Sequence, residues 1–339
     1  MKSMAIVRVV ALAVLLQLSA GLGLAADGET DIDKWHDDKK AVFLLMFDDS
    51  WPSQWQMAVP AIAQRKLTAT FYICPGKGEF LKFKDKWAKD VQDAGMVLGN
   101  HTMTHNGVAD LANADAEIGG ATKAILDMSP GKNPRLISFA QPGVGPGKWN
   151  ITGAQYKEVL AKYNLIDRPP FAGHGAVYHL QKAEQMLGLA DSAIAKGEME
   201  YLVVHGVERR GINWGYQDMW PLNYDILCTL LDGLKERQDK GDLWVTDHIS
   251  WYRYKAEREH AAVKVLNAGA KEISVDLTCS LDHDLYDLPL TLTTTVPADW
   301  KTVSVSQKDA PAKTVDVKDG KIQFEAVPNA GAVTLARQS

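Results

Sequence analysis

The chain has 339 residues, and its 37 Lys and Arg residues against 42 Asp and Glu residues give a formal net charge of −5. With 46% hydrophobic and 23% charged residues, it has the composition of a globular protein, which excludes a disordered, collagen-like or coiled-coil chain. The acidic balance argues against nucleic acid as a partner, because nucleic-acid binding needs a basic face. Three cysteines are too few for a disulfide scaffold.

Residues 1–25 have the pattern of a secretory signal peptide. Lys2 and Arg8 form a short positive region, residues 9–18 are almost wholly apolar, and small residues precede a cleavage point at Ala26. The apolar stretch is shorter than the roughly 20 residues needed to cross a bilayer. We therefore expect a secreted or periplasmic protein without stable membrane insertion.

Apolar runs alternate with amphipathic segments from residue 41 to about residue 260. Residues 41–47 form a continuous apolar run, which is typical of a strand buried on both faces. Further strands are expected at 68–74, 96–99, 136–139, 202–205 and 243–246, and helices at 54–65, 87–94, 115–128, 155–163, 180–196 and 224–240. Repeated strand–helix units predict an α/β fold, a distorted (β/α) barrel covered by helices. In such folds the chemistry lies at the carboxyl ends of the strands.

The pattern changes after residue 260. Val, Thr, Leu and Ile alternate with other residues at 273–277, 290–293 and 303–305. The runs 315–317 and 322–324, separated by Asp319-Gly320, indicate a β-hairpin. We therefore predict a catalytic domain over 26–260 and a small all-β sandwich domain over 261–339. Residues 255–260 would be a linker, or the end of a helix that leads into the second domain.

Two adjacent carboxylates, Asp48 and Asp49, follow the first predicted strand directly. Side chains of neighbouring residues at a strand end point in different directions. One carboxylate can therefore bind a cation while the other faces a substrate or water. The alternative is a helix N-cap, since Asp often precedes a helix and Trp51-Pro52 could open one.

Two histidines, His101 and His105, follow the predicted strand at 96–99. Histidines four residues apart lie on one face of a helical turn and can hold one metal ion. Imidazoles with a carboxylate are suitable ligands for zinc and its neighbours. The aspartate pair and the histidine pair, each at a strand end of an alternating α/β chain, together predict a site for a divalent metal, with zinc favoured.

With these motifs the sequence resembles the polysaccharide deacetylase family, also called the NodB-homology family or carbohydrate esterase family four. The family's Thr-Phe-Asp-Asp-Gly motif stands here as Met46-Phe47-Asp48-Asp49-Ser50, and its His-Ser/Thr-x-x-His motif stands as His101-Thr102-Met103-Thr104-His105. Residues 69–72 resemble the family's second strand, and 203–205 its Leu-x-His motif in relaxed form. The resemblance covers about 41–260.

The resemblance implies a metal-dependent hydrolase that removes acetyl groups from a carbohydrate, by N-deacetylation of an amino-sugar polysaccharide or oligosaccharide. Asp49, His101 and His105 would hold the metal. Asp48 would be the base that takes a proton from water, and His205 the acid that protonates the leaving amine. The backbone N–H of Gly143 would help to hold the oxyanion.

Two departures from the family pattern leave alternatives open. The family's Arg-x-Pro-Tyr/Phe motif would fall at 140–143, where its Arg, which orients the base, is missing. No clear form of the Asp-Trp motif, which supports the catalytic histidine, is present. The alternatives are an O-acetyl esterase acting on a polysaccharide and a catalytically weak carbohydrate-binding protein on the same scaffold. The oligomeric state is left open.

Four further residues are candidates for contact with the substrate. Trp51 and Trp149 lie in loop-like segments where an indole can stack on a sugar ring, although a single Trp more often packs in a core. His174 is flanked by small residues, and an ordinary surface loop is the alternative for it. His248 follows the strand at 243–246 and would reach the rim of the site.

Overall fold

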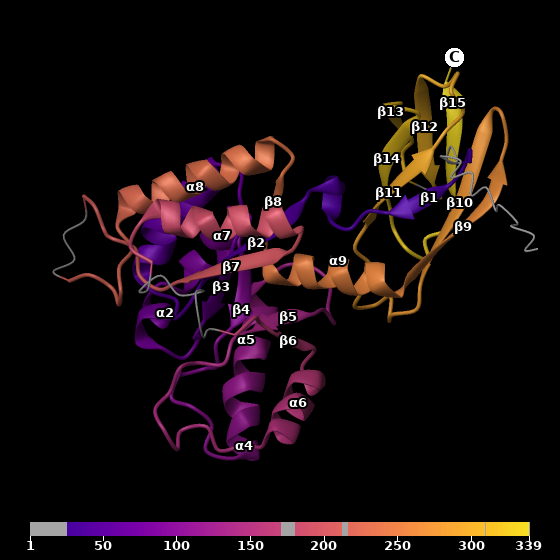
Figure 1. Ribbon diagram of the computed structural model, residues 1–339. Coiled ribbons are helices and arrows are strands. Elements are labelled where there is room, and N and C mark those ends of the chain that lie inside the picture. Colours follow the sequence, from indigo (N-terminus) through magenta and orange to yellow (C-terminus); the bar gives the residue numbers. More distant parts are fainter. Residues whose placement is uncertain (1–25, 171–179, 212–215, 309, 339) are drawn as a thin grey trace, which may run out of the picture.

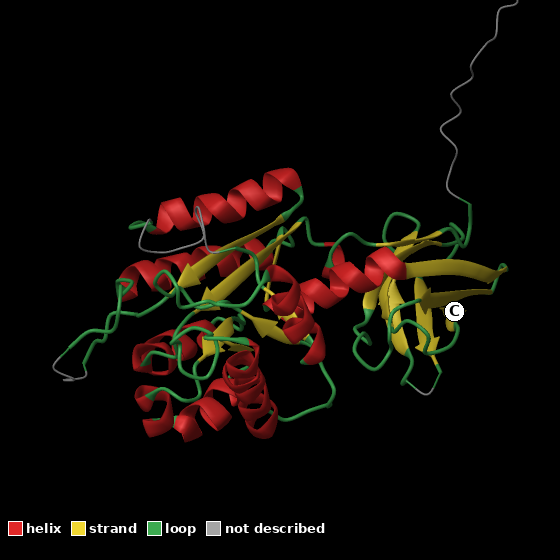
Figure 2. Cartoon of the chain, turned by 90° about the horizontal axis from the view of Figure 1, so that it is seen from below, coloured by secondary structure: helices red, strands yellow, loops and turns green. Residues whose placement is uncertain are grey.

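The computed structural model describes residues 26–170, 180–211, 216–308 and 310–338 (Figure 1). The predicted signal peptide and His174 lie outside these residues. Figures 1 and 2 show two lobes, joined by the long helix α9 (His248–His260). Residues 255–260, predicted as a linker or as the end of a helix, form the end of this helix. Among the described residues, no helix has the length and apolar character that a membrane crossing requires.

The first lobe is built on a seven-stranded sheet in which all pairings are parallel. The strand order is β6-β5-β4-β3-β2-β7, and β8 also pairs with β2. The strands are β2 (Ala41–Phe47), β3 (Thr70–Ile73), β4 (Val97–Asn100), β5 (Ile137–Phe139), β6 (Leu165–Asp167), β7 (Met199–Val204) and β8 (Leu243–Thr246). Because β6 and β7 stand at opposite ends of this order, the sheet forms an open half-barrel. The predicted distorted (β/α) barrel is confirmed.

Strand β2 is buried along its whole length, as its continuous apolar run predicts. Phe43 and Leu45 belong to a core shared with the helices, whereas Val42 and Leu44 belong to a second core that continues into the C-terminal lobe. Burying one such side chain contributes about 1.5–3 kcal/mol. The strand therefore fixes the centre of the sheet, and with it the position of the residues that follow at its carboxyl end.

Helices cover the outside of this sheet (Figures 1 and 2). In chain order they are η2 (Gln54–Ala58), α1 (Val59–Gln64), α2 (Gly78–Lys82), η3 (Lys86–Asp90), α3 (Val91–Asp93), α4 (Leu111–Ala114), η4 (Asp115–Gly119), α5 (Gly120–Met128), α6 (Gly153–Lys162), α7 (Ala183–Lys196) and α8 (Tyr224–Asp239). Local signals set their ends: Thr152 and Gln155 form a capping box at the start of α6, and Gly197 ends α7 in a left-handed conformation. The short helix η1 (His36–Asp38) lies against the second lobe, where the Asp37 N–H donates to the Thr291 hydroxyl at 2.9 Å.

The second lobe contains two antiparallel sheets, which confirms the predicted all-β domain. Their strand orders are β1-β11-β14 and β13-β12-β15-β10-β9. The strands are β1 (Thr30–Ile32), β9 (Ala261–Ala268), β10 (Glu272–Cys279), β11 (Leu290–Thr295), β12 (Thr302–Gln307), β13 (Lys313–Asp316), β14 (Lys321–Ala326) and β15 (Val333–Gln338). Alternate residues of β10, such as Ile273 and Val275, are buried, as expected for a sheet with one face in the core.

Two features of this lobe differ from prediction. Strands β13 and β14 do not form a hairpin, because β13 pairs with β12 and β14 pairs with β11. Only a single bridge, Lys318 to Lys321, closes the turn at Asp319-Gly320, which therefore passes the chain from one sheet to the other. In addition, β1 pairs with β11. The first strand of the predicted range 26–260 thus lies in the C-terminal lobe.

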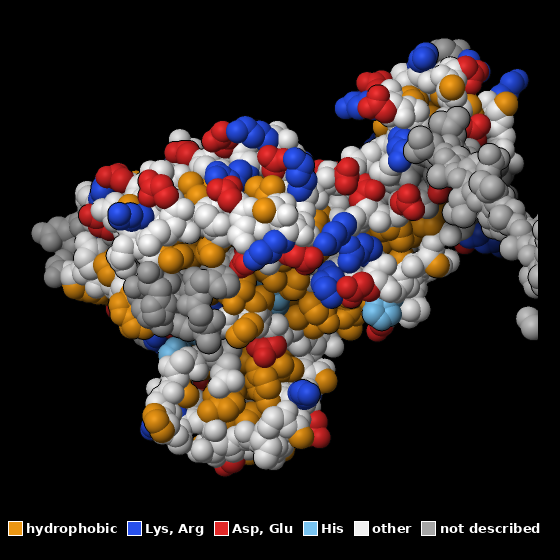
Figure 3. Space-filling view, in the orientation of Figure 1, with side chains coloured by type: hydrophobic (Ala, Val, Ile, Leu, Met, Phe, Trp, Pro, Cys, Tyr) orange, Lys and Arg blue, Asp and Glu red, His pale blue; other side chains and the backbone are white. Residues whose placement is uncertain are grey.

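One face of the molecule has a mixed surface (Figure 3). Charged side chains of both signs are interspersed over α7 and α8. Apolar side chains gather between these two helices and the helices α4–α6 of the same lobe.

Candidate active site

Polar side chains meet at the carboxyl edge of the half-barrel. The Asp49 Oδ1 atom lies 3.1 Å from His105 Nε2 and 3.4 Å from His101 Nε2. One ligand atom from each of the three residues lies within 4.8 Å of the others. Asp48, Asp49 and His101 are buried, and His105 is partly exposed. The structure therefore brings together the three residues expected from the sequence to hold a metal, with Asp48 beside them.

The turn after β2 adopts a left-handed backbone. Asp49 and Ser50 have φ angles of 76° and 53°, a conformation that costs about 1 kcal/mol or more for a residue with a side chain. Ser50 stands where the family has Gly, but its hydroxyl accepts a hydrogen bond from the Cys74 N–H at 3.1 Å. This bond ties the turn to the end of β3 and holds Asp49 in place.

Residues 101–105 form a loop, so the predicted helical turn is wrong. Thr102 and His105 have φ angles of 64° and 62°. The Asn100 Oδ1 accepts from the Thr102 N–H at 2.8 Å, while its Nδ2 donates to the Ile118 carbonyl at 2.9 Å. The Thr102 hydroxyl accepts from the His105 N–H at 3.1 Å. An anchored loop, rather than helical spacing, thus brings the two imidazoles together.

The orientation of His101 is set by a backbone carbonyl. Its Nδ1 lies 2.7 Å from the Ala140 carbonyl oxygen, which can only accept a hydrogen bond, so Nδ1 carries the proton. The Nε2 lone pair then faces Asp49. This is the arrangement expected for a metal-binding imidazole.

Asp49 provides the test of whether a metal fits. Its Oδ2 accepts from Trp51 Nε1 at 3.1 Å, whereas its buried Oδ1 has no hydrogen-bond partner among the described residues. Burial raises the pKa of Asp49, but His101, His105 and Lys77 outweigh this effect, so the pKa is lowered. An ionised oxygen that faces imidazole nitrogens without a hydrogen bond is suited to share a cation with them. The donor set fits a divalent metal such as zinc.

Asp48 is held by an arginine that the sequence analysis missed. Arg168 Nη1 and Nη2 donate to the two Asp48 oxygens at 2.7 and 2.9 Å, and both side chains are buried. Burial raises the pKa of Asp48, but the Arg168 and histidine charges outweigh it, so the pKa is lowered and the carboxylate stays ionised. Arg168 follows β6, the strand beyond β5. The sequence Arg168-Pro169-Pro170-Phe171 matches the family's Arg-x-Pro-Tyr/Phe motif. This match could have identified Arg168 from the sequence alone.

A buried polar chain lies behind Arg168. The guanidinium carbon lies 4.9 Å from the centre of the Tyr72 ring. The Tyr72 hydroxyl bonds to Ser138 at 2.7 Å, and Ser138 bonds to His248 Nδ1 at 2.7 Å. His248 is only 1% exposed, and burial lowers its pKa to about 3. The predicted contact between His248 and substrate at the rim is therefore wrong.

His205 follows β7 and is buried next to Asp48. The Asp48 N–H donates to the Val204 carbonyl at 2.9 Å, and Gln54 Nε2 donates to the His205 carbonyl at 2.8 Å. Burial lowers the pKa of His205, and the charges of Asp48 and Asp49 oppose that effect without overcoming it. The imidazole is therefore mainly neutral near pH 7.

The other predicted residues have different surroundings. Trp51 donates to Asp49 and lies under the Lys77 ammonium, 5.2 Å from the ring centre, so it orients one of the three residues that could hold a metal ion. Trp149 is partly exposed and packs against Tyr156 and the core, and its contact with the substrate stays a prediction. Gly143 is exposed after β5, and a Cβ added there would meet no atom within 4 Å. Its role towards the oxyanion stays a prediction.

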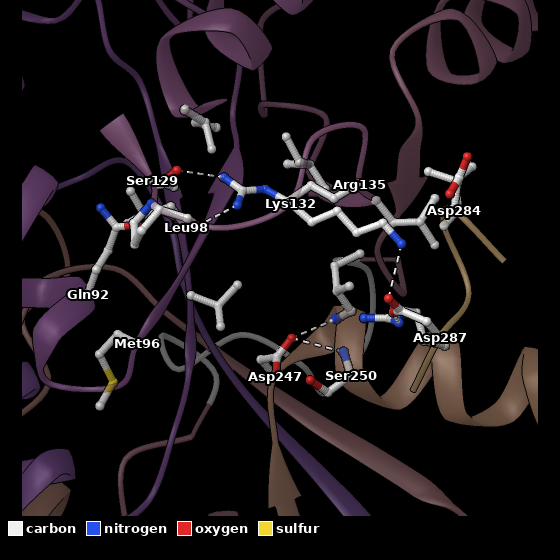
Figure 4. A pocket seen from close by; sticks show the side chains of 18 residues that line it. Gln92, Met96, Leu98, Ser129, Lys132, Arg135, Asp247, Ser250, Asp284 and Asp287 are labelled. Atoms are coloured by element: carbon white, nitrogen blue, oxygen red, sulfur yellow. Dashed lines mark hydrogen bonds and ion pairs between the residues drawn. The ribbon is translucent and has the colours of Figure 1, made fainter. Parts of the chain in front are cut away.

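A cavity of about 450 Å³ lies elsewhere, at the amino ends of β4 and β5 and the start of α9 (Figure 4). Its basic groups are already engaged: Lys132 and Arg253 pair with Asp287, and Arg135 donates to the Pro130 carbonyl at 2.6 Å. None of the residues that meet around Asp49 lines it. The cavity belongs to the junction between the lobes and not to the candidate active site.

Comparison with known proteins agrees with this geometry. Residues 36–151 match the family model described as polysaccharide deacetylase. The chain is 23% identical to a gellan lyase from a Bacillus species over 91% of its own length, but it spans only 13% of that protein. The matched segment contains both motifs that supply Asp48, Asp49, His101 and His105. Residues 36–151 of the half-barrel lobe are therefore similar to the polysaccharide deacetylase family.

Two of the solved structures that match this chain have TM-scores below 0.5. A family 4 carbohydrate esterase from Streptomyces lividans in complex with acetate has 21% identity and a TM-score of 0.40, covering 60% of this chain and 90% of its own. A peptidoglycan deacetylase from Bacillus subtilis has 12% identity and a TM-score of 0.42, covering 65% of this chain and 93% of its own.

Proposed function

We propose that this protein is an exported, metal-dependent hydrolase that removes acetyl groups from a carbohydrate, with an N-acetylated amino sugar as the favoured substrate. The observation that carries the proposal is the meeting of Asp49 Oδ1 with the Nε2 atoms of His101 and His105, beside a second buried carboxylate. The signal-peptide pattern at 1–25 supports export.

The metal would be held by Asp49, His101 and His105, and two nitrogens with one oxygen favour zinc. When bound, a divalent cation lowers the pKa of water towards about 7 and polarises a carbonyl oxygen. The unpartnered Asp49 Oδ1 and the lone pair of His101 Nε2 are the atoms that this proposal explains.

The proton transfers are assigned to Asp48 and His205. Asp48 is ionised and fixed by Arg168, so it can accept a proton from the attacking water while its orientation is held. His205 donates a proton to the nitrogen that leaves the acetyl carbon. Burial lowers the pKa of His205, so its protonated form is the minor one near pH 7 but a stronger acid than a free imidazolium, and this protonated form carries the step. The C–N bond breaks, and the products are acetate and a free amine.

Arg168 weighs against the alternative of a binding protein without turnover. That alternative rested in part on the arginine missing at 140–143, and the structure supplies one from the end of β6. Because a guanidinium that grips both oxygens fixes a carboxylate more firmly than packing alone, Asp48 is prepared for proton transfer. Hydrolysis is therefore favoured over binding.

Acetate release tests the proposal. The zinc-loaded protein is incubated with N-acetylglucosamine oligomers and with O-acetylated xylan, alongside metal-stripped protein, Asp48→Asn and His101→Ala. We expect acetate release by the wild type alone, and its return after zinc is added to the stripped wild type. Equal release by His101→Ala would refute the site. Release from xylan alone would favour the O-acetyl esterase, and glycan binding without release would favour the binding protein.

A further inference from the structure

Exposed apolar side chains gather on the loop between β7 and α8. Tyr216, Met219 and Trp220 are 50%, 38% and 47% exposed, within a stretch of five residues. Large apolar side chains on a soluble protein are normally scattered, and a group of them marks a surface that contacts something else. The question is what this loop contacts.

The loop is held firmly at its base. Asp218 is buried and accepts from the Ser53 N–H at 2.8 Å and from Arg209 Nη2 at 2.6 Å. The Gly206 N–H donates to the Met219 carbonyl at 2.9 Å, and a Cβ added at Gly206 would lie only 2.8 Å from that carbonyl oxygen. These contacts fix the backbone before Trp220, and the Leu222 N–H, which donates to the Gly206 carbonyl at 3.0 Å, fixes it afterwards. The φ of Trp220 itself is 48°.

Trp220 is presented beside the proposed acid. Its ring meets the His205 imidazole edge-on, with the ring centres 4.8 Å apart and the planes at 77°. Almost half of Trp220 nevertheless stays exposed. A firmly held indole next to the acid, and open to solvent, is placed to contact the group that the acid protonates.

The proposed reaction identifies that group. His205 would give its proton to the nitrogen that stays on the sugar, so the sugar ring must lie on the His205 side of the acetyl carbon. A pyranose has a face of C–H bonds that is apolar, and an indole offers a large flat apolar surface with little conformational entropy to lose.

We propose that Trp220 is a substrate-positioning residue that binds the C–H face of the acetylated pyranose ring. This inference rests on the proposed function, because it takes the sugar's position from the role of His205. It assigns the substrate as a pyranoside held by stacking. Trp51, one of the two tryptophans predicted for such a contact, donates its N–H to Asp49.

The test compares Trp220→Ala, Trp220→Phe and the matched control Tyr216→Ala. Tyr216 is similarly exposed on the same loop but lies over Arg209, 5.1 Å from ring centre to guanidinium carbon. With N-acetylglucosamine tetramer and zinc-loaded protein, we expect Trp220→Ala to raise KM about tenfold with little change in kcat. Trp220→Phe should recover most of the loss, and Tyr216→Ala should stay within about twofold. Metal content and circular dichroism should be unchanged in all three.

A binding experiment that needs no turnover tests this inference independently of the proposed function. Calorimetry with the same tetramer is performed on Asp48→Asn, with and without Trp220→Ala. Tetramer binding that weakens about tenfold without Trp220 supports the inference, even if the wild type releases no acetate. Unchanged affinity and KM in Trp220→Ala, or a tetramer that does not bind to Asp48→Asn at all, would overturn it. So would an equal KM change in Tyr216→Ala.

Discussion

In the part of the chain that the structure describes, two clusters of imidazoles and carboxylates could hold a metal ion, and they differ in how they are held. Asp49, His101 and His105 meet at the edge of the half-barrel, where Asp49 and His101 are buried. The other cluster consists of His36, Asp37 and Glu325, and its residues are partly or fully exposed. Residue types alone make both clusters candidates for a metal.

The difference lies in what surrounds the ligands. The Ala140 carbonyl fixes the tautomer of His101, and Trp51 fixes one Asp49 oxygen so that the other faces the imidazoles. At the second cluster, Nδ1 of His36 lies 3.2 Å from Glu325 and Nε2 lies 3.7 Å from Asp37. The two carboxylates lie beside opposite ring nitrogens, so one cation bound at either nitrogen cannot replace both contacts. Supporting hydrogen bonds, and not residue types, thus make the Asp49 cluster the stronger candidate for a metal site.

The largest expected effect comes from removing a ligand. Asp49→Asn should lower bound zinc to background and reduce kcat/KM for acetate release by about 10³-fold or more, because the metal supplies the activated water. The matched control Glu325→Gln should keep both at wild-type values. Metal analysis by mass spectrometry and the acetate assay measure the two outcomes. Loss of zinc in Glu325→Gln would mean that the His36 cluster, and not the Asp49 cluster, binds the metal.

Removing the partner of Asp48 should be the next largest effect. Arg168→Met keeps the volume but leaves a buried carboxylate unpaired, which costs about 3–5 kcal/mol of stability. The pKa of Asp48 should rise, so the acid limb of the kcat profile should move to higher pH, and kcat should fall by about 10²-fold at neutral pH. Bound zinc should persist. A profile with an unmoved acid limb would contradict the role of Arg168.

Trp51→Phe should act on the metal alone. Losing the N–H that holds Asp49 Oδ2 should weaken zinc affinity by about 10–100-fold, the range known for such supporting contacts. Trp149→Phe, in the packed aromatic pair with Tyr156, is the control and should bind zinc normally. Zinc titration with a competing chelator measures both. Equal affinities would show that Trp51 does not orient the ligand.

Glu257 should affect stability without affecting the site. It is buried in α9, and burial raises its pKa from 4.5 to about 7. Between these values the unfolded chain loses the proton while the folded chain keeps it, so the free energy of unfolding should fall as pH rises from about 4.5 through 7. Glu257→Gln should remove this slope and be more stable by about 1–3 kcal/mol at pH 8. The free energies of unfolding of both proteins are measured by urea unfolding at pH 5 and at pH 8. An equal change between the two pH values in the wild type and in Glu257→Gln would contradict the prediction.

The sequence predicts what is locally encoded. The apolar run at 41–47 and the motifs that follow it depend on residues near in the chain, and the structure confirms the fold and the meeting of Asp49 with His101 and His105. Arg168 was missed because tertiary structure decides which strand end reaches Asp48. The loop at 101–105 was predicted as a helical turn because spacing cannot show the hydrogen bonds made by Asn100.

The C-terminal lobe shows the same limit. Strand β1 pairs with β11, with Thr30 opposite Thr294, and no local pattern indicates so distant a partner. The turn at Asp319-Gly320 has the residues of a hairpin, but the strands on either side of it join different sheets. The residues Asp319-Gly320 determine only that the chain reverses direction. The strand with which each flanking strand pairs depends on how its alternate apolar side chains pack.

The most direct test is a crystal structure of the zinc-loaded protein with anomalous data collected at the zinc absorption edge. The account predicts one strong peak at about 2.0–2.2 Å from Asp49 Oδ1 and from the Nε2 atoms of His101 and His105, and none beside His36. A protein that contains one equivalent of zinc but shows its peak beside His36 and Glu325, or away from Asp49, would contradict it.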